Sequence, residues 1–187
     1  MDFARVIREV VVPLESAGVN YALIGGFAMA LHGLLRATMD LDFLVMLEDL
    51  PAADALLGSK GYQRVFRSDN VSHYESPDLQ WGRIDILHAF RGPSLGMLKR
   101  AVRLEVMPGA SLRVARVEDL VGLKVQALKN DPRRADADWA DIRLMVAAAG
   151  EAGTSLDWEL IADYLNLFGF GEHLPALKEI HGTTDGY

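Results

Sequence analysis

Two aspartates separated by one leucine, Asp40 and Asp42, stand at the start of an almost entirely apolar stretch that runs from Leu41 to Leu47. Such a stretch predicts a strand that is covered on both faces. Residues two apart in a strand point to the same side of the sheet, so the two carboxylates should lie together. They repel each other unless a cation bridges them, and hard oxygen ligands suit magnesium. We therefore expect either a solvated pair at a strand edge or two ligands of a divalent cation.

A third aspartate, Asp85, lies inside the apolar segment RIDIL, which also predicts a strand. An acid in such a strand needs a partner, and Arg83, two residues earlier on the same face, is one candidate. The alternative is that sheet pairing brings Asp85 beside Asp40 and Asp42 as a third metal ligand. Three carboxylates around one or two magnesium ions can position a triphosphate and activate a hydroxyl for in-line attack.

A glycine pair, Gly25-Gly26, separates the short apolar segment YALI from FAMALHG, and the order predicts a strand, a turn and a helix. Glycine lets the backbone turn sharply, and the start of the next helix offers N–H groups to a phosphate. The alternative is a tight turn without a ligand. Arg36 and Thr38 precede the aspartate pair, where they would contact phosphate, or Arg36 would only neutralise the acids.

Lys124 stands in an otherwise apolar segment with helical spacing. A lysine can snorkel from such a place, but we favour a role in binding a ligand. Asp138 and Asp141 begin the next predicted helix. For them we expect a helix-start pair or an ion pair with Arg133 or Arg134.

The periodicity predicts an α/β block followed by helices. Strands are expected at 21–25, 41–47, 62–67, 71–75, 83–90, 98–106 and 111–114, and helices at 3–17, 27–33, 50–57, 117–129, 135–149, 157–168 and 172–181. We interpret residues 1–115 as a core and 116–187 as a C-terminal helical subdomain packed on it.

The 187 residues carry a net charge of −7 and no cysteine, and half of them are apolar. We expect a cytoplasmic protein without disulfides, and the acidic balance argues against a general nucleic-acid-binding surface. No apolar run has the length of a membrane span. Residues 83–134 contain eleven Lys or Arg and five acids, a net +6, which leaves −13 for the rest. This excess is either ordinary surface charge or a basic wall that faces phosphates.

The order strand, Gly-Gly, helix, Asp-x-Asp, strand, with a later Asp in a strand, resembles the nucleotidyltransferase fold shared with DNA polymerase beta. More narrowly, IGGFAMALHGLLRATMDLDFLV is similar to the AbiEii-type and minimal-nucleotidyltransferase-like proteins of bacteria. The matching residues are Gly25, Gly26, Ala28, His32, Gly33, Arg36, Thr38, Asp40 and Asp42. The segment LVGLKVQALKNDPRRADADWADIRLM resembles a helical motif of the same group, and the resemblance covers roughly residues 15–150.

The resemblance implies an α/β (α+β) fold, with a mixed sheet flanked by helices and a C-terminal helical part. It implies an enzyme that moves a nucleoside monophosphate from an NTP such as ATP to an RNA, for example a tRNA, or to a protein. A toxin with a cognate antitoxin is one candidate. The implied roles are Mg²⁺ or Mn²⁺ ligands for Asp40, Asp42 and Asp85, the catalytic base for Asp85, triphosphate contact for Gly25 and Gly26, and nucleotide contact for Lys124.

Two further hypotheses stay open: a departure from the motif supports one, and the charge of −13 outside residues 83–134 supports the other. Active members of the wider superfamily often have Gly-Ser where this chain has Gly25-Gly26, so one phosphate-binding hydroxyl is missing. A non-catalytic module of this fold that binds a nucleotide or a partner is therefore the second hypothesis. The third is a small-molecule adenylyltransferase of the antibiotic-modifying type, whose acceptor pocket would be acidic.

Overall fold

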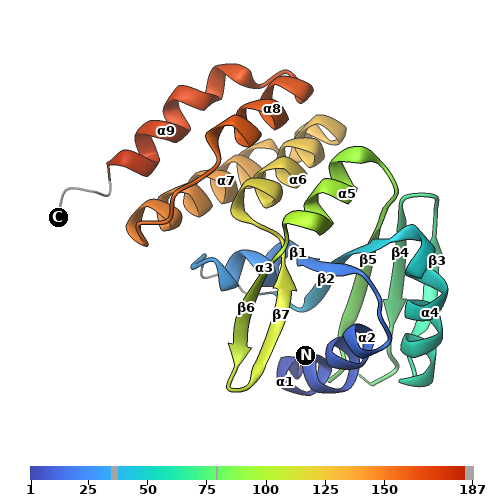
Figure 1. Ribbon diagram of the computed structural model, residues 1–187. Helices are drawn as coiled ribbons and strands as arrows, with labels where there is room; N and C mark the ends of the chain where they lie inside the picture. The colour runs from blue at the N-terminus through green and yellow to red at the C-terminus, as the bar shows by residue number, and fades with distance from the viewer. Residues whose placement is uncertain (35–37, 79, 184–187) are drawn as a thin grey trace. The chain divides into compact units, whose positions relative to one another are not determined.

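The described part of the chain contains seven strands, which pair into one mixed sheet (Figure 1). The computed structural model describes residues 1–34, 38–78 and 80–183. The strands are β1 (Tyr21–Ile24), β2 (Asp40–Met46), β3 (Gln63–Arg67), β4 (Val71–Glu75), β5 (Arg83–Ala89), β6 (Val102–Met107) and β7 (Ala110–Val114). The helices are α1 (Phe3–Val6), α2 (Val12–Ser16), α3 (Gly25–Leu31), α4 (Leu50–Ser59), α5 (Gly92–Arg100), α6 (Val117–Asn130), α7 (Ala135–Glu151), α8 (Trp158–Phe168) and α9 (Leu174–Gly182).

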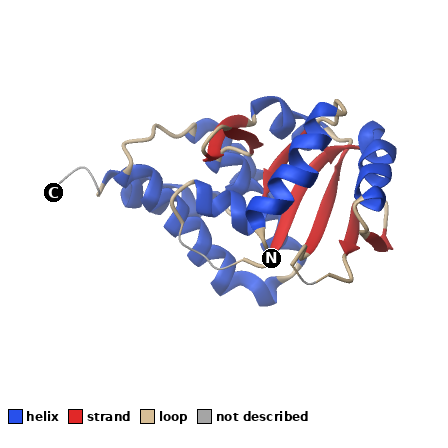
Figure 2. Ribbon diagram, turned by 90° about the horizontal axis from the view of Figure 1, so that it is seen from below, coloured by secondary structure: helices blue, strands red, loops and turns tan. Residues whose placement is uncertain are grey.

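The strand order is β3-β4-β5-β2-β1-β7-β6. Strand β2 runs parallel to β5 and antiparallel to β1, and β5 runs antiparallel to β4. Figure 2 shows the strands side by side with helices against the sheet. The predicted fold class, a mixed sheet flanked by helices and followed by a helical part, is confirmed.

Alternation along β2 and β5 divides their side chains between two faces. One face is apolar and has no solvent exposure at Leu41, Phe43, Ile84 and Ile86. Burial of this face anchors the two strands in the core, because each large apolar side chain contributes about 1.5–3 kcal/mol when removed from water. The opposite face of the same two strands carries the aspartates. The apolar packing therefore fixes the register on which their positions depend.

The first helical segment begins where the sequence predicts. The carboxylate of Asp2 accepts the backbone N–H of Arg5 (3.0 Å), which caps α1. Residues Ile7–Val11 form a π-helical turn that joins α1 to α2. None of the helices within the described ranges is long and apolar enough to cross a membrane.

The strand predicted over 98–106 is wrong in its first part, because Leu98, Lys99 and Arg100 end helix α5. That helix starts at Gly92, with Pro93 in its first turn, where a missing N–H costs nothing. The side chain of Ser94 accepts the backbone N–H of Arg91 (3.2 Å). Two glycines in nine residues lower the helix propensity and hide this helix in the sequence. The other predicted strands and helices are confirmed, with small differences at their ends.

The chain divides into two compact units, with a boundary after Ala115. The first unit contains β1–β7 with α1, α2, α4, α5 and the start of α3. The second contains Met29–Leu34 and the helices α6–α9, in which α6 packs on α7 and α8, and α7 packs on α9. The interpretation of these units as a core and a packed subdomain stays a prediction.

Candidate active site

Two rows of polar residues cross strands β2, β5 and β4 at one end of the sheet. The register places Asp42 opposite Asp85 and Asp85 opposite His73, and in the next row it places Asp40 opposite Arg83 and Arg83 opposite Glu75. The next pairs toward the other end are apolar, Leu44 with Leu87 and Leu87 with Val71. The proximity of Asp85 to the aspartate pair is therefore present in the structure. Its role as a metal ligand stays a prediction.

Asp42 is a half-buried acid with two other carboxyl groups nearby. Its pKa is raised from 3.8 to about 6, first by burial of the carboxyl group and then by the neighbouring charges of Asp85 and Asp40. The backbone N–H of Gly26 and the positive charge of Arg83 act in the opposite direction. The carboxyl groups of Asp40 and Asp85 are thus close enough to Asp42 to disfavour its ionised form.

The glycine pair makes room for Asp42. Gly25 has φ +65°, and a Cβ at this position would overlap the Oδ2 atom of Asp42. The backbone N–H of Gly26 lowers the pKa of Asp42, against the effect of its acidic neighbours. The two glycines form the first turn of α3, so the sheet carboxylate sits directly against the start of this helix. Their contact with a triphosphate stays a prediction.

Thr38 ties the segment before β2 to the aspartate pair. Its hydroxyl donates to the carbonyl oxygen of Asp40 (3.1 Å). The same side chain crowds position 26, because a Cβ on Gly26 would lie 3.1 Å from both Cβ and Oγ1 of Thr38. A serine at position 26 would therefore require Thr38 to shift by a few tenths of an ångström. Arg36 lies outside the described residues.

Asp85 is held by Arg83, the partner that the sequence offers two residues earlier. Arg83 Nε donates to Oδ1 and Nη2 donates to Oδ2, both at 2.9 Å. His73 Nδ1 also lies 2.7 Å from Oδ1, and its ring stacks on Phe66. His73 is not recognisable as a site residue from the sequence, because a histidine inside a predicted strand gives no sign of which residue stands opposite. The pairing of β4 with β5 supplies that information.

No protein-family model and no curated protein matches the chain, whereas several solved structures do. ANT(2")-Ia in complex with adenylyl-2"-tobramycin superposes with a TM-score of 0.65 at 15% identity, covering 88% of this chain and 97% of that one. An antigenic nucleotidyltransferase-like protein from Paracoccidioides brasiliensis gives 0.60 at 17% identity, covering 97% and 92%. The lincomycin-bound lincosamide antibiotic adenylyltransferase LnuA gives 0.51 at 15%, covering 75% and 94%.

The chain has the nucleotidyltransferase fold. The resemblance drawn from the Gly-Gly and Asp-x-Asp motifs is confirmed at this level, and the narrower AbiEii-type branch stays a prediction. Identities of 15–17% establish the fold alone.

In this nucleotidyltransferase fold, the three aspartates fit a divalent cation unequally. Asp40 and Asp42 are hard oxygen donors close enough for Asp40 to raise the pKa of Asp42. Asp85 has both oxygens bonded to Arg83. Among the described residues, no three His, Asp or Glu side chains converge in an arrangement that could hold a metal ion. Asp40 and Asp42 therefore offer donors suited to a cation, whereas the charge of Asp85 is already offset by Arg83.

Lys124 belongs to the second unit of the nucleotidyltransferase fold, on α6. Its Nζ donates to Asp138 Oδ1 (2.7 Å) and to Asp141 Oδ2 (2.6 Å), both on α7. Arg134 Nε also donates to Asp138 (3.0 Å), so the predicted ion pair between these two residues is confirmed. The nucleotide contact predicted for Lys124 stays a prediction.

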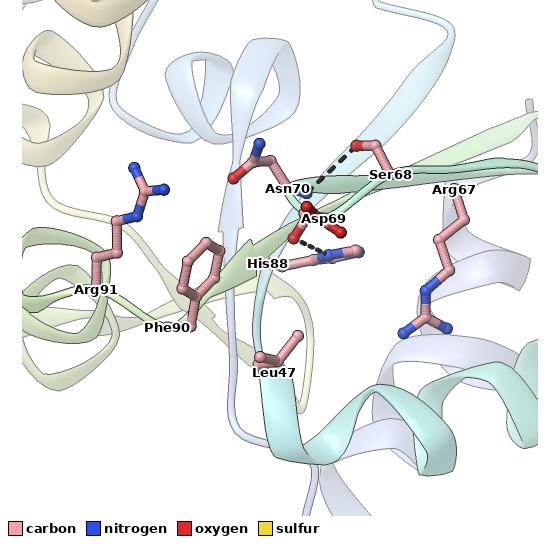
Figure 3. Close-up of a pocket in the computed structure, with 8 residues that line it drawn as sticks. All are labelled: Leu47, Arg67, Ser68, Asp69, Asn70, His88, Phe90 and Arg91. Atoms are coloured by element: carbon pink, nitrogen blue, oxygen red, sulfur yellow. Dashed lines mark hydrogen bonds between the residues drawn. The ribbon is translucent and has the colours of Figure 1, made fainter.

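A separate pocket of about 380 Å³ lies at the other end of β2 and β5 from the aspartates (Figure 3). It is lined by Leu47, Arg67, Ser68, Asp69, Asn70, His88, Phe90 and Arg91. Both ring nitrogens of His88 are bonded, Nε2 to Ser72 Oγ and Nδ1 to the carbonyl of Asp69, each at 2.9 Å. Arg67 bonds Asp54 (3.2 Å). These two polar groups therefore already have protein partners.

Proposed function

We propose that the protein transfers a nucleoside monophosphate from an NTP to a hydroxyl group of an acceptor, with release of pyrophosphate. The observation that carries this proposal is the placement of three aspartates on neighbouring strands, Asp42 opposite Asp85 and Asp40 two residues from Asp42. The nucleotidyltransferase fold supports it.

The proposed chemistry forms one bond and breaks another at the α-phosphorus. The acceptor oxygen attacks this phosphorus, the bond to the β-phosphate oxygen breaks, and the hydroxyl proton passes to a base, for which Asp85 is the proposed residue. Asp40 and Asp42 would hold Mg²⁺ or Mn²⁺, and such an ion neutralises phosphate charge when bound. Gly25, Gly26 and Thr38 would line the triphosphate side.

Two acceptor classes remain in this proposal. A small antibiotic-type acceptor is favoured by two of the similar structures, one in complex with adenylyl-2"-tobramycin and one lincomycin-bound. An RNA or protein acceptor, with a toxin role and a cognate antitoxin, rests on the AbiEii-type resemblance.

The test is label transfer from each of the four α-³²P NTPs, with Mg²⁺ or Mn²⁺, to an aminoglycoside, a lincosamide, tRNA or a cell lysate. We expect one acceptor to be labelled by the native protein and not by the Asp42→Asn variant. Asp163→Asn removes the same charge from an exposed position on α8 and serves as the matched control. Equal labelling by native protein and Asp42→Asn would contradict catalysis at this site. Nucleotide binding without any transfer would favour a non-catalytic binding module.

A further inference from the structure

The carboxylate of Asp85, the proposed third metal ligand, is already paired with a positively charged side chain of the protein, Arg83. The guanidinium of Arg83 makes two parallel hydrogen bonds to the carboxylate, at 2.9 Å each. This bidentate arrangement is the strong form of an arginine–carboxylate pair. Each carboxylate oxygen keeps a second lone pair. The guanidinium nevertheless offsets the negative charge of Asp85 and fixes the orientation of its carboxylate, so a divalent cation and Arg83 would compete for this group.

Exposure shows which partner of this pair can move. The side chain of Arg83 is 41% exposed, whereas that of Asp85 is 15% exposed. Arg83 is therefore the outer partner, and its long side chain can turn toward solvent while Asp85 stays fixed in the strand. His73 holds one oxygen of Asp85 from β4 and keeps the carboxylate in place.

The charges around Arg83 indicate what would draw it away. Its charge interacts with those of Asp85 on its own strand, Asp40 and Asp42 on β2, and Glu75 on β4. A cation bound at Asp40 and Asp42 would weaken the attraction that holds Arg83 on this face. The planar guanidinium also matches the oxygens of a phosphate group.

We propose that Arg83 is a positioning residue that holds Asp85 out of the metal centre until the phosphates of a bound nucleotide draw the guanidinium away. This inference rests on the proposed function, because it assumes that a triphosphate binds beside the aspartates. It assigns to the nucleotide a part in assembling the site. The native chain should therefore bind a divalent cation weakly in the absence of nucleotide.

The experiment measures binding of Mn²⁺ alone to the full chain by electron paramagnetic resonance, without nucleotide or acceptor. Arg83→Gln should bind Mn²⁺ more tightly than the native protein, on the order of tenfold, because Asp85 becomes available as a ligand. Arg83→Lys keeps the charge but loses the bidentate hydrogen bonding, so its Mn²⁺ affinity should lie between those of the native protein and Arg83→Gln. Asp85→Asn placed in the Arg83→Gln background should abolish the gain.

A matched control exists in the second unit. Arg133 forms the same kind of fork with Asp131, also two residues away, with Nε at 2.8 Å from Oδ1 and Nη2 at 3.0 Å from Oδ2. Arg133→Gln removes the same charge and should leave Mn²⁺ affinity unchanged. Circular dichroism confirms the fold of each variant, and Arg83→Lys carries the test if Arg83→Gln does not fold.

Unchanged or weaker Mn²⁺ binding by the Arg83 variants would overturn the inference, and so would a gain that survives Asp85→Asn. Since no transfer is measured, these outcomes are independent of the proposed activity. Label transfer can fail while the Mn²⁺ result holds. Label transfer can also succeed while the Arg83 variants bind Mn²⁺ no more tightly than the native protein.

Discussion

At the scale of single residues, Asp42 shows a conflict between folding and function. Its carboxyl group is half-buried beside Asp85 and Asp40, and desolvation together with these neighbouring charges raises its pKa to about 6. A carboxylate in such a place destabilises the folded chain when it is ionised. A bound divalent cation would remove that cost. This cost in stability is expected if the site binds a cation, as we propose.

This conflict predicts the effect of pH on Asp42→Asn. Because the pKa is near 6 in the folded chain and 3.8 as the ordinary value, the folded state alone holds the proton between these limits. The free energy of unfolding therefore falls as pH rises through this window and levels off above pH 6. Asparagine mimics the protonated acid, so the variant should be more stable than the native chain above pH 6, by up to about 3 kcal/mol. The difference should disappear toward pH 4.

The measurement is urea unfolding in EDTA at several pH values between 4 and 8. Asp163→Asn is the control for a change in net charge at an exposed position. A stability difference between Asp42→Asn and the native chain that does not change with pH would contradict the assignment of this pKa.

The sequence predicts part of this residue-level arrangement. Asp40 and Asp42 are found from their spacing, and Asp85 from its place in an apolar strand. The Arg83 contact follows from alternation, since residues 83 and 85 share a face. His73 cannot be found in this way, because alternation within segment 71–75 does not reveal which strand lies beside it. Its position opposite Asp85 depends on a second, long-range strand pairing that local patterns do not encode.

At the scale of elements, helices α6 and α7 are joined by a buried ionic cluster. Lys124, Asp138 and Asp141 have side chains that are 14%, 2% and 12% exposed. Lysine Nζ bridges the two acids, and Arg134 adds a second contact to Asp138. Together these cations lower the pKa of Asp138 although burial alone would raise it. In the second unit, Lys124 therefore has a structural role that does not require a nucleotide.

The cluster predicts a large loss of stability for Lys124→Met. The change leaves two buried carboxylates without their shared cation, which costs about 3–5 kcal/mol when one partner of a buried pair is removed. The measurement is urea unfolding without nucleotide, monitored by tryptophan fluorescence. In a Trp81→Phe background the signal comes from Trp139 and Trp158 and therefore reports unfolding of the second unit. Arg133→Gln breaks an exposed pair and should change stability little. Native-like stability of Lys124→Met would refute the structural role and favour the nucleotide role.

Element boundaries follow from sequence where periodicity is strong and fail where glycine interrupts it. The apolar alternation of β2 and β5 and the spacing in α6 and α7 are readable because burial imposes them. Helix α5 is not readable, since Gly92, Pro93 and Gly96 obscure its period and its start depends on the Ser94 contact.

At the scale of the whole molecule, the fold is established more firmly than the acceptor. Similar structures at 15–17% identity share the arrangement of strands and helices with this chain. A fold of this kind supports several activities, and the acceptor is decided by local side chains. The segregation of charge between residues 83–134 and the rest of the chain is visible in the sequence. The basic segment 83–134 belongs partly to each unit, since the boundary lies after Ala115. The charge pattern in the sequence therefore does not define a single basic wall.

Ligand binding at the aspartates should change the stability of the whole chain. A ligand that binds only the folded state adds about 2.7 kcal/mol at a concentration one hundred times its Kd. Mg²⁺ together with an NTP should therefore raise the melting temperature of the native protein at pH 7.5. The shift should be smaller at pH 5, because Asp42 is then protonated and must lose its proton to bind a cation.

Because the chain carries a net charge of −7, any divalent cation could also stabilise it without a specific site. Thermal unfolding of Asp42→Asn and Asp163→Asn separates the two effects, since both variants lose one negative charge. Specific binding predicts a shift in Asp163→Asn equal to that of the native protein and little shift in Asp42→Asn. Equal shifts in both variants, or a shift that does not depend on pH, would show that general charge screening is responsible.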